Sequence, residues 1–147
     1  YAGCDLSGPS WPSVLMKAGF RPESQSFGSL LGISYYLSKE EFRNLLGGIS
    51  SIWSNGSAIC LDYPLAECGM ESKRNRELAA AAGEQMKARY TYIELEALLA
   101  EAGFLIYEHM NAVDATEAFF QQYNRKDPCH SMTAPNGVGY CLAVRKD

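Results

Sequence analysis

The pattern of apolar and polar positions predicts an alternation of strands and helices along the chain. Its clearest unit is residues 26–63, where apolar runs over 27–33 and 57–63 flank a helical pattern over 38–53. The helical segment repeats apolar side chains at a spacing of about 3.6 residues. Both apolar runs read as strands buried on both faces, which is typical of a parallel sheet with helices on its faces.

Ligands of such a sheet lie at the carboxyl ends of its strands. We therefore expect the chemistry of this protein at residues 31–37 and 61–64. The Gly47-Gly48 pair inside the helical segment costs about 1 kcal/mol per glycine relative to alanine. This pair predicts either a very close approach between helices or an irregular helix.

The remaining elements complete an order that can be written βαβαβααβαβ. Only a short helix and a long loop separate the last two strands, so the last strand is expected to pair antiparallel. The other predictions are a strand over 1–6, a helix over 11–18 capped by Ser10, a mobile loop over 64–72, a helix over 73–89 that Gly83 can break, a helix over 92–102 capped by Thr91, a strand over 104–109, a helix over 114–123 after Val113, a polar loop over 124–131 and a strand over 139–145.

Composition and charge narrow the class of protein. The 147 residues suit one domain, with 47% hydrophobic and 20% charged residues. The net charge of -4 gives no basic footprint for nucleic acid, and no apolar run approaches the length of a membrane span. Five widely spaced cysteines do not read as a disulfide framework, so we expect a cytoplasmic protein. The chain opens with Tyr1 and reads as if it began within a strand, so we expect a piece of a longer protein.

Two groups of side chains are candidates for binding a small molecule. Asp5 ends the first predicted strand and either accepts a hydrogen bond from an amine of a ligand or caps the Gly-Pro turn behind it. Tyr35, Tyr36, Asp62 and Tyr63 meet at the ends of the two central strands. They form either the wall of a small-molecule site or an aromatic edge of the core, with Asp62 capping the following turn.

Several common kinds of site are disfavoured by the sequence. Residues 28–32 have the glycines of a nucleophile elbow but Leu30 where the serine belongs, which argues against a hydrolase. No G-x-G-x-x-G sequence occurs in the chain, so the usual dinucleotide-binding loop is absent from it. His109, Cys129 and His130 do not share a metal-ligand spacing with another cysteine, so no metal is expected.

Residues 18–42 resemble S-adenosylmethionine-dependent methyltransferases of the leucine carboxyl methyltransferase type. That family has a Gly-Phe turn, a polar loop, an apolar strand, a Glu-Gly pair, a Tyr-Leu pair and an acidic helix start. The matching positions here are Gly19, Phe20, Gly32, Tyr36, Leu37, Glu40 and Glu41. The likeness continues through residues 56–64, 83–84, 92–104 and 139–144, so it covers nearly the whole chain.

The resemblance implies a fold and a cofactor. The fold is α/β, the C-terminal part of a doubly wound, Rossmann-like class I methyltransferase sheet whose last strand is antiparallel. Residues 1–147 would be a single, incomplete methyltransferase domain that begins at the third strand of the family. Asp5 and Leu6 match the pair that reads the adenine of S-adenosylmethionine, and Leu31 and Gly32 fall where the strand end faces this cofactor. The family has a glutamate at the position of Leu31.

The resemblance also implies an activity, which is methyl transfer to a carboxyl or hydroxyl oxygen of a small molecule or peptide. Tyr36, Tyr63 and Glu84 are assigned to the acceptor side, and no catalytic residue is identified. The strands with the family's Gly-rich turn and ribose-binding acid are missing from the chain, so the chain alone is expected to be inactive and to bind the cofactor weakly or not at all. The alternative is a non-catalytic, methyltransferase-like module that interacts or dimerises through a sheet edge at residues 1–6.

Overall fold

A sheet of four strands forms the centre of the computed structural model, which describes residues 2–66, 70–81 and 83–146. The strand order is β1-β2-β4-β3, with β1 at Phe27–Leu30, β2 at Ala58–Pro64, β3 at Phe104–Met110 and β4 at Val138–Arg145. Strands β1 and β2 are parallel, whereas β4 lies between β2 and β3 and is antiparallel to both. The predicted α/β class and antiparallel last strand are therefore confirmed.

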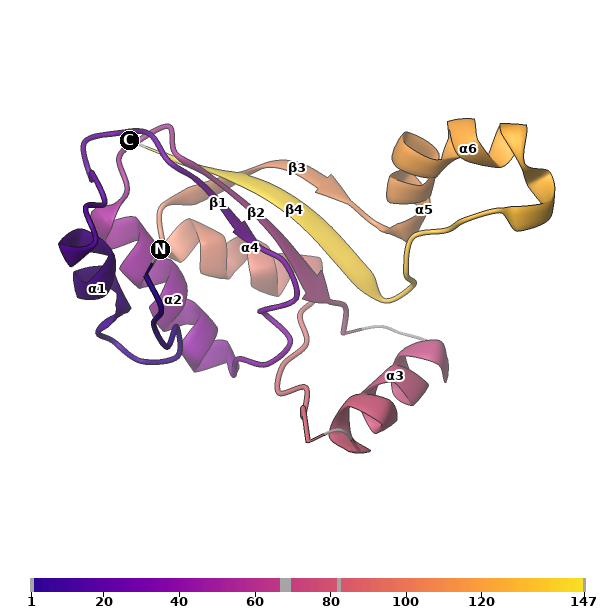
Figure 1. Cartoon of the computed structure of the whole chain (residues 1–147), viewed down its shortest axis with the longest axis horizontal. Coiled ribbons are helices and arrows are strands. Elements are labelled where there is room, and N and C mark those ends of the chain that lie inside the picture. The colour runs from indigo at the N-terminus through magenta and orange to yellow at the C-terminus, as the bar shows by residue number, and fades with distance from the viewer. Residues whose placement is uncertain (1, 67–69, 82, 147) are drawn as a thin grey trace.

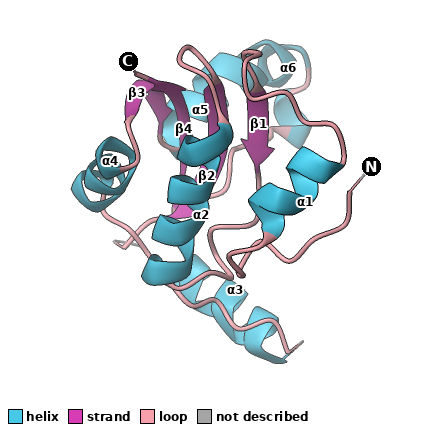
Figure 2. Cartoon of the chain, turned by 90° about the vertical axis from the view of Figure 1, so that its left-hand side faces the viewer, coloured by secondary structure: helices cyan, strands magenta, loops and turns pink. Residues whose placement is uncertain are grey.

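Helices cover one face of this sheet. Figure 1 shows α1, α2 and α4 on the same side of the strands, while α3 projects from the body and α5 and α6 lie beyond the far end of β3 and β4. In Figure 2, α2 lies in front of the sheet, roughly along the direction of its strands, with α1 and α4 to either side. The helices are α1 at Trp11–Lys17, α2 at Lys39–Ile52, α3 at Met70–Ala81, α4 at Tyr92–Glu101, α5 at Ala112–Ala115 and α6 at Gln121–Lys126, with a π-helical turn at Thr116–Phe120 and a 3-10 turn at Pro128–His130.

The core lies between the sheet and the two long covering helices. Both helices begin with a capping box, Ser38 with Glu41 before α2 and Thr91 with Glu94 before α4, as the sequence predicts for Thr91. Side chains of β2 alternate between this core and the opposite face because successive residues of a strand point to opposite sides. The buried side chains include Phe42, Leu45, Leu46, Ile49, Ile59, Leu61, Tyr63, Tyr90, Leu95, Leu99 and Phe104.

Two glycines permit close packing in this core. A Cβ on Gly48 of α2 would lie 2.6 Å from a ring carbon of Trp11, so α1 rests directly on the glycine backbone. The prediction of a close helix approach at the Gly47-Gly48 pair is thus confirmed at Gly48. A Cβ on Gly139 of β4 would lie 2.5 Å from the ring of Tyr63, which therefore occupies the space that a side chain would need.

The opposite face of the sheet is open in the described part of the chain. Phe27, the first residue of β1, and Leu31, which follows its last residue, are 68% and 57% exposed, and Leu105 and Tyr107 of β3 are 51% and 77% exposed. The prediction that both parallel strands are buried on both faces is therefore wrong, because helices cover one side only. Within the described residues, no helix is long and apolar enough to cross a membrane.

Two predictions for the first residues are also wrong. Residues 2–6 do not form a strand, since no described strand lies beside them to supply hydrogen-bond partners and Asp5 instead bonds Ser7 within a turn. Ser10 stands at the start of α1, but its side chain forms no capping hydrogen bond there.

The segment between β2 and α4 differs from its prediction. The expected mobile loop over 64–72 falls partly on residues 67–69, which lie outside the described residues, and α3 already begins at Met70. The expected helix over 73–89 ends at Ala81, and the chain then runs extended past the strand ends. Backbone hydrogen bonds hold it there, from the N–H of Lys87 to the carbonyl of Tyr35 and from the N–H of Tyr90 to the carbonyl of Pro64.

The helix predicted over 114–123 is longer and begins earlier. Asn111 caps it by accepting hydrogen bonds from the backbone N–H groups of Val113 and Asp114, and the Asp114 side chain completes the capping box. The helical path continues through the π-helical turn to Lys126. The predicted polar loop over 124–131 therefore contains the end of α6 and the 3-10 turn.

Candidate functional site

The carboxyl ends of the parallel strands β1 and β2 meet at Asp62. Its Oδ1 accepts a hydrogen bond of 2.7 Å from the backbone N–H of Gly32, and its Oδ2 accepts a longer one of 3.4 Å from the hydroxyl of Tyr35. Its backbone carbonyl accepts a third, of 2.8 Å, from the hydroxyl of Ser34. One residue of β2 thus fixes the whole loop that leaves β1.

Gly32 allows the sharp turn in this loop. Its φ angle of +73° lies in the left-handed region, where side chains other than glycine are strained. No atom outside its immediate neighbours lies within 4 Å of the position that a Cβ would occupy, so the turn borders open space. Sequence reasoning left Asp62 either in a ligand wall or as a cap of the following turn, and its observed side-chain bonds go to the loop after β1 instead.

The negative charge of Asp62 affects the pKa values of the two phenols beside it, Tyr35 and Tyr140. Burial, and after it the nearby Asp62 carboxylate, raises the pKa of Tyr35 well above its usual range. The same two causes raise the pKa of Tyr140, which pairs with Asp62 across β2 and β4. Both phenols therefore keep their protons near neutral pH, and the edge presents one carboxylate flanked by neutral aromatic rings.

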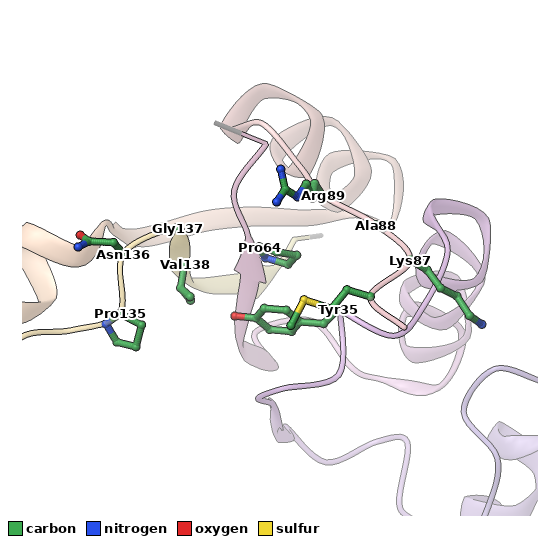
Figure 3. Close-up of a pocket in the computed structure, with 10 residues that line it drawn as sticks. Tyr35, Pro64, Lys87, Ala88, Arg89, Pro135, Asn136, Gly137 and Val138 are labelled. Carbon is green, nitrogen blue, oxygen red and sulfur yellow. The ribbon is translucent and has the colours of Figure 1, made fainter. Parts of the chain in front are cut away.

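A cavity of about 260 Å³ opens beside this edge. Figure 3 shows Tyr35, Pro64 and Val138 around it, with Pro135 and Asn136 on one side and Lys87 pointing away from it. Lys87 instead forms an ion pair of 3.3 Å with Glu41. The residues that line the cavity are Tyr35, Pro64, Met86, Lys87, Ala88, Arg89, Pro135, Asn136, Gly137 and Val138. The cavity thus combines the loop after β1, the extended segment before α4 and the start of β4.

Two of the predicted acceptor residues lie together near this edge. The hydroxyl of Tyr36 donates to Oε2 of Glu84 over 3.3 Å, which joins the loop after β1 to the segment after α3. Burial and then the charge of Glu84 raise the pKa of Tyr36. Both side chains remain accessible, with Tyr36 38% exposed. This pair was 48 residues apart in the sequence, and no spacing pattern connects them.

Tyr63, the third predicted acceptor residue, points into the core instead. Its side chain is fully buried, and its hydroxyl lies 2.8 Å from Nε2 of His109. Asp62 and Tyr63 are neighbours in β2, so they point to opposite faces of the sheet. The predicted aromatic cluster is therefore divided, with Tyr35 and Asp62 at the edge and Tyr63 in the core.

The predicted adenine-binding pair lies in the turn before α1. The Asp5 carboxylate is exposed and accepts hydrogen bonds from the backbone N–H of Ser7 at 2.9 Å and from its hydroxyl at 2.7 Å. These bonds lower the pKa of Asp5. Leu6 is half-buried and packs against the core. In this structure Asp5 therefore caps its turn, which is the second of the two roles expected for it.

Leu31 borders a second, largely apolar cavity on the open face of the sheet. This cavity measures about 520 Å³, and its walls include Phe27, Cys60 and Tyr140 together with the aromatic residues Phe119 and Phe120 at the end of the π-helical turn. Leu31 lines only this apolar cavity, Gly32 lines neither cavity, and Pro135 lines both. The predicted cofactor residues of the strand end are adjacent to open space, as a contact with a ligand requires.

Sequence reasoning missed three parts of this site. The bonding role of Asp62 was missed because it joins strands that are 30 residues apart. The residues 86–89 were assigned to a helix, and residues 135–138 lie in a stretch without a periodic pattern. A signal was available only for Asp62, because a carboxylate near the end of a strand in a parallel sheet is a common ligand or loop contact.

These residues fit one side of a site for a cationic nucleoside cofactor. Gly32 leaves room at the strand end, Leu31 offers an exposed apolar surface, and Asp62 supplies negative charge. The Asp5 carboxylate is engaged with Ser7 and would have to release it to bind an amine. Among the described residues, no group of three His, Cys, Asp or Glu side chains could hold a metal ion.

Comparison with known proteins shows that the chain is similar to methyltransferases. The leucine carboxyl methyltransferase family matches residues 1–50 of the chain. YktD of Bacillus subtilis (strain 168), whose name gives S-adenosyl-L-methionine-dependent methyltransferase as its assumed function, is 38% identical over 138 residues. That match covers 90% of this chain and 43% of YktD, so the chain spans less than half the length of this curated relative. The predicted resemblance to this family is confirmed.

Solved structures support the same fold. A DUF574 family protein from Streptomyces avermitilis has a TM-score of 0.69 at 16% identity, over 97% of this chain and 53% of that chain. An O-methyltransferase family protein from Burkholderia thailandensis has a TM-score of 0.57 at 9% identity, over 98% of this chain and 35% of that chain. LepI, in a complex with S-adenosylmethionine, has a TM-score of 0.53 at 16% identity, over 84% of this chain and 28% of LepI. Each of these chains is longer than the region it shares with this one.

Proposed function

We propose that this chain is the carboxyl-terminal part of an S-adenosylmethionine-dependent methyltransferase of the leucine carboxyl methyltransferase type. The observation that carries the proposal is the 38% identity to YktD, which extends over 90% of the chain. The geometry supports it, because Asp62 and Gly32 fix the strand ends at which an α/β sheet of this kind binds ligands. The bound cofactor would supply a methyl group on a cationic sulfur.

We further propose that the acceptor atom is an oxygen of a small molecule or peptide. Methyl transfer requires the donor, the transferred carbon and the acceptor to be held in line, and positioning alone can supply much of the rate enhancement. A carboxylate acceptor needs no strong base. The phenols of Tyr35 and Tyr140 keep their protons near neutral pH, so they suit hydrogen-bond donation to an acceptor better than proton removal.

The residues of the edge have distinct proposed roles. Leu31 and Gly32 would contact the cofactor at the end of β1, with Asp5 and Leu6 at its adenine end. Tyr36 and Glu84, which are bonded to each other and accessible, would hold the acceptor beside the cavity of about 260 Å³. Tyr63 stays a prediction without a supporting contact, because its side chain is fully buried against His109.

Titration calorimetry of the whole protein with S-adenosylmethionine tests the proposal. We expect saturable binding by the whole protein and little or no binding by residues 1–147 alone, since this chain supplies one side of the site. Absence of binding to the whole protein would overturn the proposed function. Strong binding to residues 1–147 would overturn the proposal that further strands complete the site.

A non-catalytic interaction module is the second candidate function. The observation in its favour is the exposed apolar surface of β3, an edge strand on which Leu105 and Tyr107 are 51% and 77% exposed. The edge first predicted for this role, residues 1–6, is not a strand. A homodimer through β3 would sediment at twice the mass of the chain, whereas a concentration-independent monomer would exclude it. We place either form in the cytoplasm, because the four described cysteines are free thiols.

A further inference from the structure

We infer that Asp62 provides the negative charge that distinguishes the charged methyl donor from its uncharged product at this edge. The inference rests on the proposed function and adds a specificity-determining residue to it. The donor carries a sulfonium cation, whereas the product left after methyl transfer, S-adenosylhomocysteine, is a neutral thioether. A carboxylate near the sulfur would therefore favour binding of the donor and assist release of the product.

The hydrogen bonds of Asp62 leave its charge available. Its Oδ1 accepts one short bond, from the backbone N–H of Gly32, and its Oδ2 has only the 3.4 Å contact from the Tyr35 hydroxyl. Neither partner is a cation, and no ion pair of Asp62 occurs among the described residues. The side chain is half-buried, so its field is screened less by water than that of a fully exposed group.

The position of this charge is fixed by the same bonds. Gly32 follows the end of β1 at a φ of +73°, and the space beside its Cα is open. The N–H···Oδ1 distance of 2.7 Å holds the carboxylate against the backbone that borders this space. A group bound at the strand end would thus meet a carboxylate that needs no rearrangement to face it.

The role of Asp62 can be tested by placing a carboxylate at the neighbouring position Leu31. Leu31 is 57% exposed and precedes Gly32 in the sequence. It contributes no charge, so Asp62 is the acidic side chain bonded to this turn. The neighbouring phenols report the charge, since Asp62 contributes to the raised pKa of Tyr35 and Tyr140.

The experiment compares the affinities of the whole protein for S-adenosylmethionine and S-adenosylhomocysteine by titration calorimetry. Asp62→Asn keeps an oxygen that can accept from the Gly32 N–H but removes the charge. We expect it to lower the preference for the donor by about fivefold, the effect of one partly screened charge contact, while changing affinity for the product much less. Ser34→Ala, which removes a neutral bond to the same loop, should change both affinities by the same factor.

Leu31→Glu keeps the inference falsifiable if Asp62→Asn fails to fold, because it alters the charge at the same turn and leaves Asp62 in place. At this exposed site it should raise the preference for the donor. Where Asp62→Asn does fold, the Leu31→Glu/Asp62→Asn double variant should recover the preference that Asp62→Asn loses. An equal loss of both affinities in Asp62→Asn, or no gain of preference in Leu31→Glu, would overturn the inference. Failure of the wild-type protein to bind either molecule would instead overturn the proposed function, so the two outcomes are distinguishable.

Discussion

The two faces of the sheet differ in whether helices cover them. One face packs against α2 and α4, and its side chains Ile59, Leu61 and Tyr63 on β2 are fully buried. The other face has exposed apolar side chains at both edges, with Phe27 68% exposed on β1 and Tyr107 77% exposed on β3. The covered face forms a buried hydrophobic core, whereas the open face is an apolar surface that no second layer of helices or strands covers in the described part of the chain.

The covered face therefore accounts for the stability of the fold, and the open face with its adjoining edge is where a ligand can bind. The covered face supplies the burial that holds the strands in register, and it is dense enough that two glycines are needed to fit aromatic rings. The open face contains the apolar cavity lined by Phe27, and the adjoining carboxyl edge contains the cavity lined by Tyr35 and Pro64. Substitutions on the covered face should therefore change folding, and substitutions at the edge should change ligand binding.

The largest expected difference between the faces comes from truncating one phenylalanine on each. Phe42→Ala removes a fully buried ring of α2 and should reduce the free energy of unfolding by about 3–5 kcal/mol. Phe27→Ala, on the open face, should change it by no more than about 0.5 kcal/mol. Urea unfolding followed by circular dichroism measures both. Equal losses in the two variants would mean that the open face is buried in solution.

A smaller and opposite pair of effects is expected from the adjacent glycines of α2. Gly48→Ala would push a methyl group into the Trp11 ring and should lower the free energy of unfolding by about 1–3 kcal/mol. Gly47→Ala meets open space and should raise it by about 0.5–1 kcal/mol, the usual gain of alanine over glycine in a helix. Thermal unfolding midpoints should therefore move in opposite directions. A stabilising Gly48→Ala would contradict the close approach of α1 and α2.

The smallest expected effect is a dependence of stability on pH through His109, at the rim of the covered face. Burial lowers the pKa of His109 below its usual 6.5. The unfolded chain therefore binds a proton at a higher pH than the folded chain does, so the free energy of unfolding should fall as the pH is lowered through 6.5.

Urea unfolding at pH 7.5, 6.5 and 5.5 measures this loss, and the His109→Gln variant should reduce its slope. His130→Gln is the matched control, because His130 is exposed and lies in the 3-10 turn away from the core. An identical pH dependence in wild type and His109→Gln would show that other groups are responsible.

The sequence was sufficient for elements whose pattern is local. The helix from Lys39 to Ile52 and the strand from Ala58 to Pro64 follow the predicted bounds closely, because apolar periodicity and a Ser38 cap specify them within a few residues. The antiparallel last strand was also predictable, from the long connection before it. Residues 84–89 were misassigned to a helix because alanine, glutamate and lysine favour helices, whereas their backbone is held by bonds to Tyr35 and Pro64.

The candidate site depends on contacts that no local pattern contains. Tyr36 and Glu84 were named from the resemblance, and the structure brings them within hydrogen-bond distance. Tyr63 was named with them, but strand alternation turns it away from Asp62 and into the core. The bond from Gly32 to Asp62 requires the pairing of β1 with β2, which sets two strand ends side by side. Sequence reasoning therefore found the edge and named Asp62 in it, but not the bond to Gly32 by which Asp62 holds the loop.

Amide hydrogen exchange of the whole protein, with and without S-adenosylmethionine, tests most directly whether this carboxyl edge is a wall of the cofactor site. We predict slower exchange at residues 31–36 when the cofactor is present, with the exposed amides of α6 unchanged. Binding of the cofactor without protection of residues 31–36 would contradict the assignment of this edge.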